Sequence, residues 1–194
     1  MPSLHPALNN SMVVLIKGFD GFVVFVIFNV RILLCCFLNY YLIVMVSSIG
    51  PELIAVCGMN CALCSSYLSM KNDLKNKGIK MPYCVGCRPK NKICSFIKKK
   101  CSKLSNNEVN FCYECKDFPC ENLSAMSNRY NTRYRMSMVD NLVFIKQNGL
   151  EKFLQQQKQT WKCPTCGELI CCHNGLCYNC QLEILKNKKE KYRW

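Results

Sequence analysis

The cysteines of this chain recur in pairs separated by two residues, and that spacing restricts the possible folds more than any other feature. The pairs are Cys61/Cys64, Cys84/Cys87, Cys112/Cys115, Cys163/Cys166 and Cys177/Cys180. A Cys-x-x-Cys pair places two thiolates on one tight turn, where they can bind a single metal ion, whereas structural disulfides rarely use this spacing. We therefore expect a fold that is organised by metal.

The redox state of the thiols follows from their number and from the start of the chain. The 194 residues include 18 cysteines, far more than an ordinary core of that size uses. A secreted disulfide scaffold would need a cleavable signal peptide, but the apolar segment near the start is too long and lacks a small-residue cleavage site. We therefore predict reduced thiols and a cytoplasmic cysteine-rich domain.

The first group of predicted metal ligands lies between Pro51 and Leu123. It comprises Cys57, Cys61, Cys64, Cys84, Cys87, Cys94, Cys101, Cys112, Cys115 and Cys120. These thiols suffice for two four-ligand sites, but their order along the chain does not fix the grouping. The simplest grouping joins Cys84/Cys87 to Cys112/Cys115, and gives Cys57, Cys61 and Cys64 a fourth ligand from Cys94, Cys101 or Cys120.

A second group of predicted ligands lies in the segment WKCPTCGELICCHNGLCYNC. Its ligands are Cys163, Cys166, Cys177 and Cys180. Between the two pairs, LICCH is strand-like and Asn-Gly is the favoured type I′ hairpin turn, so a β-hairpin would fold the second pair back onto the first. This pattern predicts a zinc ribbon. We expect Cys171 and Cys172 to pack within it and His173 to be exposed at the turn.

The remaining segments complete the predicted organisation. Ser137 is a potential helix cap and Asn148-Gly149 a stop signal, followed by a second helical pattern up to Trp161. We predict an apolar leader (1–50), a cysteine-rich metal-binding domain of loops and short helices (51–123), a helical connector (124–160), a zinc ribbon (161–185) and a basic tail (186–194). Together they make a small, metal-stabilised α+β fold.

The apolar leader allows two interpretations. Residues 21–46 are long enough to span a bilayer as a transmembrane helix, interrupted by Arg31, and the flanking charges would place the cysteine domain on the cytoplasmic side of the membrane. Alternatively, translation starts near Met45 rather than at Met1, and the upstream residues are not part of the working protein. We favour the later start, because the cysteine domain requires nothing upstream.

Charge and motifs restrict the function without fixing it. The formal charge is +14, and three four-thiolate zinc sites, each about −2, would reduce it to roughly +8. A non-catalytic adaptor that binds a protein or nucleic acid is our main expectation, with two or three zinc ions. An iron–sulfur electron carrier, with its cluster in the first domain, and a zinc-dependent enzyme are the alternatives. No motif calls for catalysis, since His5 and His173 are the only histidines.

The order of motifs resembles a known family. The segments ELIAVCGMNCALCSSYLSMKN, MPYCVGCRPKNKIC and FCYECKDFPCENL are similar to the small cysteine-rich prokaryotic proteins described as domain of unknown function 3795. The resemblance covers approximately Glu52 to Leu123 and implies metal binding through the first group of cysteines, but no established activity. Family members usually begin close to the first cysteine motif, so the resemblance also favours the later start.

Overall fold

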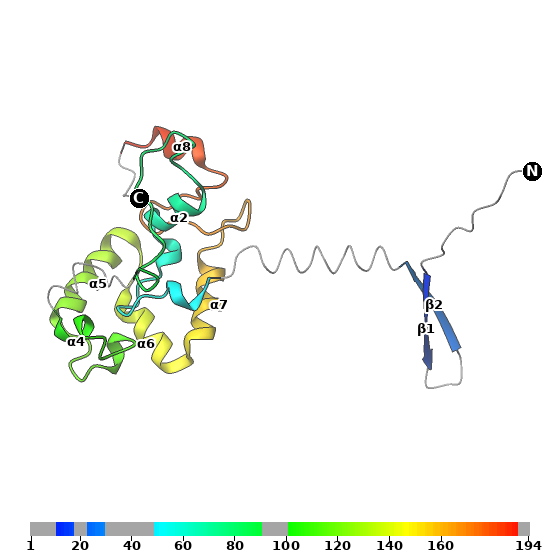
Figure 1. Cartoon of the computed structure of the whole chain (residues 1–194), viewed down its shortest axis with the longest axis horizontal. Helices are drawn as coiled ribbons and strands as arrows, with labels where there is room; N and C mark the ends of the chain where they lie inside the picture. Colours follow the sequence, from blue (N-terminus) through cyan, green and yellow to red (C-terminus); the bar gives the residue numbers. More distant parts are fainter. Residues whose placement is uncertain (1–10, 18–22, 30–48, 91–100, 190–194) are drawn as a thin grey trace, which may run out of the picture. The chain divides into compact units, whose positions relative to one another are not determined.

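The chain forms two compact units in a computed structural model (Figure 1), which describes residues 11–17, 23–29, 49–90 and 101–189. The first unit is Met1–Ser48 and the second is Ile49–Trp194. The cysteine pairs all belong to the second unit, so the site lies there.

The first unit contains an antiparallel pair of strands, β1 (Ser11–Lys17) and β2 (Val23–Asn29), with Val14 opposite Val26 at its centre. The predicted transmembrane helix over 21–46 is therefore wrong where the structure describes it, at residues 23–29, and residues 21–22 and 30–46 lie outside the described part. The physical reason is composition: Val, Ile and Phe favour strands, and an apolar run alone does not distinguish a strand from a helix. Among the described residues, no helix has the length and apolar character needed to cross a bilayer.

The second unit is helical. Its short elements are η1 (Pro51–Leu53), η2 (Cys61–Leu63), α2 (Ser65–Lys71), α4 (Ser102–Ser105), η3 (Cys112–Glu114) and α8 (Leu182–Asn187), where η marks a 3₁₀ turn. Its longer helices are α5 (Glu121–Tyr134), α6 (Met138–Asn148) and α7 (Leu150–Thr160). Residues 49–90 and 101–189 include no strand. The predicted α+β class is therefore wrong for this unit.

The predicted C-terminal β-hairpin does not form either. Two isolated bridges, Lys162 with Leu169 and Ile170 with Cys177, take its place. The chain turns back too early for a strand, because the Gly175 N–H donates to the Cys171 carbonyl at 2.9 Å. The residues enclosed by the Ile170–Cys177 bridge therefore form a tight turn and not a ladder of paired strands.

Local signals in the sequence explain the bounds of α6 and α7. The Ser137 hydroxyl accepts a hydrogen bond from the Asp140 N–H and caps α6. Gly149 has φ of 84° and its N–H donates to the Ile145 carbonyl, which ends α6 and starts α7. Both helices agree with the signals read from the sequence. Consecutive helices α5, α6 and α7 contact one another in sequence order.

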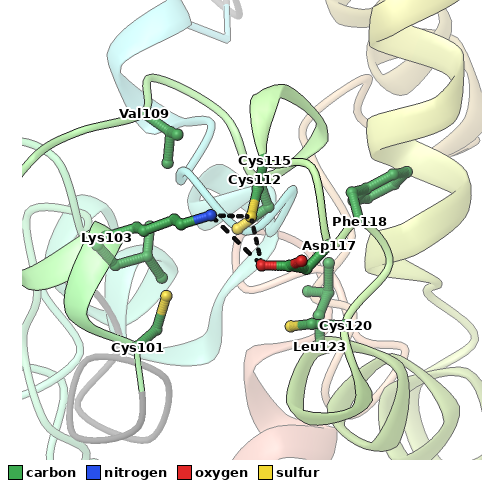
Figure 2. Close-up of a pocket in the computed structure, with 10 residues that line it drawn as sticks. Cys101, Lys103, Val109, Cys112, Cys115, Asp117, Phe118, Cys120 and Leu123 are labelled. Atoms are coloured by element: carbon green, nitrogen blue, oxygen red, sulfur yellow. Dashed lines mark hydrogen bonds and ion pairs between the residues drawn. The ribbon is translucent and has the colours of Figure 1, made fainter.

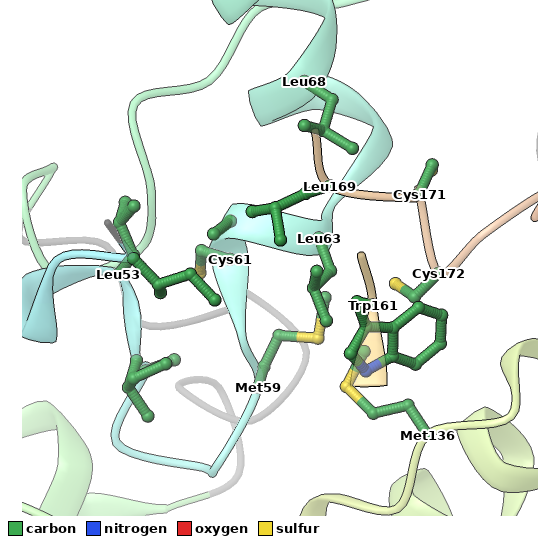
Figure 3. Close-up of a cluster of buried hydrophobic side chains, with 14 of the residues drawn as sticks. Leu53, Met59, Cys61, Leu63, Leu68, Met136, Trp161, Leu169, Cys171 and Cys172 are labelled. Atoms are coloured by element: carbon green, nitrogen blue, oxygen red, sulfur yellow. The ribbon is translucent and has the colours of Figure 1, made fainter. Parts of the chain in front are cut away.

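One hydrophobic core joins the cysteine-rich segment to the C-terminal segment. Leu63 and Met59 lie beside Met136 and Trp161 in this core, with Leu169 nearby (Figure 3). Leu63 and the α7 residue Phe153 are fully buried. The first domain, connector and C-terminal segment are therefore packed as one body, and the position of each cysteine turn depends on the others.

Candidate metal centre

Four thiols converge in the C-terminal segment. The sulfur atoms of Cys163, Cys166, Cys177 and Cys180 all lie within 4.8 Å of one another. The Sγ–Sγ distance is 3.5 Å between Cys163 and Cys180 and 3.4 Å between Cys166 and Cys177. A tetrahedron of sulfurs around one zinc ion, with Zn–S of about 2.3 Å, has edges of about 3.8 Å. The four sulfurs are thus spaced to bind a single ion, and we call them the C-terminal tetrad.

Each half of the tetrad is built by the same backbone turn. The N–H groups of Thr165 and Cys166 donate to the Cys163 sulfur, and those of Asn179 and Cys180 donate to the Cys177 sulfur. In each turn, the backbone N–H groups two and three residues after the first cysteine therefore point toward its sulfur. A glycine, Gly167, closes the first turn with φ of 77° and an N–H bond to the Cys163 carbonyl at 2.9 Å.

The protonation of the tetrad reflects its crowding. Burial raises the pKa of Cys163, but the N–H groups of Cys166 and Thr165, followed by the Cys180 thiol, outweigh burial and lower this pKa to about 6. Hydrogen bonding to Cys163 raises the pKa of Cys180 to about 12, and burial raises the pKa of Cys177. Cys163 therefore forms a thiolate readily while Cys177 and Cys180 hold their protons, so binding a cation would release protons.

The segment between the two halves repeats the same turn without a second thiol. The Cys171 sulfur accepts from the N–H groups of His173 and Asn174, and Gly175 has φ of 70°. The position equivalent to Cys166 is occupied by Asn174, whose Oδ1 accepts from the Leu176 N–H at 3.2 Å. Cys171 instead accepts a hydrogen bond from the Tyr178 hydroxyl at 3.3 Å. This third turn is closed by hydrogen bonds rather than by a ligand set.

His173 departs from the sequence-based expectation. We expected an exposed turn residue, but its side chain is only 7% exposed. Its Nδ1 accepts a hydrogen bond from the Ser65 N–H at 3.2 Å, and its ring meets the ring of Tyr134 edge to face with a centroid distance of 4.7 Å. Burial lowers the His173 pKa to about 4. The histidine is thus a neutral packing residue that links the C-terminal segment to the first cysteine motif.

Four thiols of the first domain gather around η2. The Cys87 N–H donates to the Cys61 sulfur at 3.4 Å, and the Cys84 N–H donates to the Ser66 carbonyl at 3.1 Å. Hydrogen bonding to Cys87 and then burial raise the pKa of Cys61, and burial with the nearby Cys84 and Cys87 raises that of Cys64. The structure therefore places Cys84/Cys87 beside Cys61/Cys64, and not beside Cys112/Cys115 as the simplest grouping supposed.

A buried asparagine positions the η2 motif. The Asn60 Oδ1 accepts from the Ala62 N–H at 3.1 Å, and its Nδ2 donates to Gln157 Oε1 of α7 at 3.3 Å. The Cys64 N–H then closes the turn on the Cys61 carbonyl at 3.0 Å. Asn60 lies within the first cysteine motif, but nothing in that motif predicts its hydrogen bond to Gln157, which is nearly one hundred residues away.

The other predicted ligands of the first domain fall into three situations. Cys101, Cys112, Cys115 and Cys120 line one cavity (Figure 2), together with Lys103 and Asp117. Burial, with the nearby Cys101 and Cys120, raises the pKa of Cys112 to about 12. Cys57 is buried in the hydrophobic core, and Cys94 lies outside the described residues. Within the described part of the chain, only the C-terminal tetrad brings its ligand atoms within 4.8 Å of one another.

Comparison with known proteins supports the family resemblance. Residues 53–125 match the sequence profile of a family described as Protein of unknown function (DUF3795). The match includes the cysteines around η2 and those that line the cavity, and it ends before the C-terminal tetrad. No curated protein and no solved structure matches the chain.

Proposed function

We propose that this protein is a zinc-stabilised, non-catalytic binding module, with one structural zinc ion in the C-terminal tetrad. The observation that carries the proposal is the convergence of four thiol sulfurs within 4.8 Å of one another. Four thiolates complete the coordination of zinc and leave no position for a water nucleophile, which is the usual difference between structural and catalytic zinc sites.

Packing around the tetrad supports a structural role. Cys163 and Cys177 are buried, whereas Cys166 and Cys180 are exposed, so the ion would join the core on one side and face solvent on the other. The described part of the C-terminal segment contains no regular backbone ladder and only two isolated bridges, Lys162 with Leu169 and Ile170 with Cys177. Zinc binding supplies on the order of 10 kcal/mol in small zinc-dependent folds, enough to offset this deficit.

The spacing of the tetrad favours one ion over an iron–sulfur cluster. Sulfur atoms at 3.4 Å and 3.5 Å can share a single tetrahedral metal, whereas a cluster holds its cysteines around a larger core of iron and sulfide. The decisive measurement is anaerobic purification of the full chain, followed by metal analysis and a visible spectrum. Zinc with a colourless protein is expected, and bound iron with visible absorption would contradict the zinc proposal.

A substitution tests the site residue by residue. Cys166→Ser removes one ligand at an exposed position and should lower the bound zinc by one ion. Cys171→Ser is the matched control. It also removes a thiol, but the new serine oxygen can still accept the hydrogen bond that the Tyr178 hydroxyl donates to Cys171. The control should retain all its zinc. Equal zinc contents for Cys166→Ser and the unmodified chain would refute the proposed site.

The binding role rests on charge. The chain has a formal charge of +14, which zinc thiolates reduce but do not cancel, so an acidic macromolecule is the partner we propose. Binding to a nucleic acid would weaken steeply with added salt, because each neutralised phosphate releases counterions. A titration with a nucleic acid duplex at two salt concentrations tests this. Weak, salt-independent binding would point to a protein partner instead.

A further inference from the structure

We infer that Cys101, Cys112, Cys115 and Cys120 form a second site for one thiophilic divalent metal ion, distinct from the C-terminal tetrad. This site is additional to the zinc ion proposed for the tetrad, because the two sites share no cysteine. It also replaces the grouping that the sequence suggested, in which Cys112/Cys115 shared a site with Cys84/Cys87.

The first observation is a cavity that the four cysteines share. Their side chains line a cavity of about 30 Å³, with Leu104, Val109, Phe118 and Leu123 as its apolar walls (Figure 2). A cavity needs only about 10–15 Å³ to hold one water-sized particle. The space therefore accommodates a single ion, and it is too small for a cluster of several iron and sulfide atoms.

The second observation is the way in which the backbone presents these thiols. Cys112–Glu114 form the 3₁₀ turn η3, and the Cys115 N–H donates to the Cys112 carbonyl at 3.1 Å. The same turn holds Cys61 and Cys64, where the corresponding bond is 3.0 Å. Each pair therefore projects two thiols from one short turn, as a metal-binding Cys-x-x-Cys pair does.

The two remaining ligands come from helix starts. Cys101 is the N-cap of α4, and Cys120 is the N-cap of α5. Three elements of different position in the sequence, α4, η3 and α5, thus contribute ligands to one cavity.

A lysine compensates for the charge of such a site. The Lys103 Nζ lies 3.2 Å from the Cys115 sulfur and 3.3 Å from Asp117 Oδ2. Four thiolates around a divalent ion carry about −2, so the ammonium offsets part of that charge in a partly buried position. Figure 2 shows the Lys103 side chain pointing toward Cys115 and Asp117. The four cysteines are only partly buried, and a neighbouring cation would offset the negative charge of their thiolates.

The cavity set differs from the C-terminal tetrad in compactness. No three of its ligand atoms lie within 4.8 Å of one another, whereas all four of the tetrad do. Binding would therefore draw the cysteines inward onto the ion and fix α4 against η3 and α5. We expect the metal to order this region more than it orders the tetrad.

Metal counting in the full chain tests the inference, with zinc as the probe. Cys115→Ser should lose one zinc and keep the ion of the tetrad, Cys166→Ser should show the reverse, and Cys171→Ser should lose none. Loss in Cys115→Ser alone would refute the tetrad but not the cavity site. An unchanged zinc content in Cys115→Ser would overturn the second site.

A measurement without substitutions covers the case in which Cys115→Ser fails to fold. Alkylation of the zinc-loaded full chain, read by mass spectrometry peptide by peptide, reports the protection of each thiol. Cys101, Cys112, Cys115 and Cys120 should be protected together and become reactive together as a chelator is added. Alkylation of these four at rates independent of zinc would overturn the inference.

Lys103→Gln tests the electrostatic part of the inference. The variant should retain the zinc content at saturation but bind the cavity-site ion more weakly, by up to about fivefold at low salt, because the Cys115 thiolate loses its partner. Added salt should narrow the difference between the variant and the unmodified chain. An affinity for zinc equal to that of the unmodified chain at low salt would exclude a role for Lys103.

Discussion

The buried histidine makes the stability of the second unit depend on pH. His173 is 7% exposed and burial lowers its pKa to about 4, against about 6.5 in an unfolded chain. Between these values the unfolded chain binds the proton and the folded chain does not. Stability from this group is therefore fully present above pH 6.5 and is lost as the pH falls toward 4.

The magnitude follows from the two pKa values. Between pH 7 and pH 5, protonation of His173 in the unfolded chain should lower the free energy of unfolding by about 2 kcal/mol, and by about 3 kcal/mol at pH 4. His173→Asn removes the titrating group but supplies an amide oxygen in place of Nδ1, which accepts from the Ser65 N–H at 3.2 Å in the unmodified chain. His173→Phe keeps a ring against Tyr134 but loses the acceptor.

The assay is urea denaturation at pH 7, 6 and 5, with zinc held at one free concentration. Acid also weakens thiolate–metal bonds, but this loss is common to the unmodified chain and to both variants, so the comparison cancels it. The unmodified chain should lose about 2 kcal/mol more than either variant between pH 7 and pH 5. Parallel losses in all three proteins would refute the buried neutral histidine.

Three further changes test the packing that holds the cysteine turns. Gly58→Ala should lower the free energy of unfolding by about 3 kcal/mol in thermal denaturation, because φ is +82° and a Cβ there would lie 2.7 Å from Leu142 Cγ. The control is Gly78→Ala, which has a similar φ of +79° but nothing within 4 Å of the added Cβ, and it should cost about 1 kcal/mol. Asn60→Ala should lower the free energy of unfolding by about 2–4 kcal/mol. In a double-mutant cycle, the same substitution should cost less when it is made in a chain that already carries Gln157→Ala. Chelation should lower the melting temperature by circular dichroism, and zinc should restore it; a melting temperature unaffected by chelation would contradict a metal-stabilised fold.

Sequence signals of short range predicted the structure best. The Ser137 cap and the Gly149 stop are read from adjacent residues, and both delimit helices in the structure. The spacing of Cys163/Cys166 and Cys177/Cys180 likewise reported two equivalent turns, which the structure brings together. A turn or cap depends on a few neighbouring dihedral angles, and the residues that set those angles are visible in the sequence.

Features that depend on distant contacts were not predictable. The grouping of Cys84/Cys87 with Cys61 rather than with Cys112 depends on how residues 79–88 return to α2, and no local pattern encodes that path. His173 sits beside a turn signal, yet its burial is decided by Ser65 and Tyr134. Likewise the apolar run near the start has helical length, but β2 pairs with a partner strand.

The third turn, at Cys171 to Asn174, explains how the C-terminal segment packs against the first domain. The two turns of the tetrad carry exposed thiols at Cys166 and Cys180, where an ion can enter. The third turn has Asn174 in place of the second thiol and is buried. From it, the Cys172 N–H donates to the Leu63 carbonyl at 3.0 Å, directly beside the η2 motif. With hydrogen bonds replacing a ligand set, this turn needs no solvent-facing ion, and it can therefore serve as the contact between the C-terminal segment and the first domain.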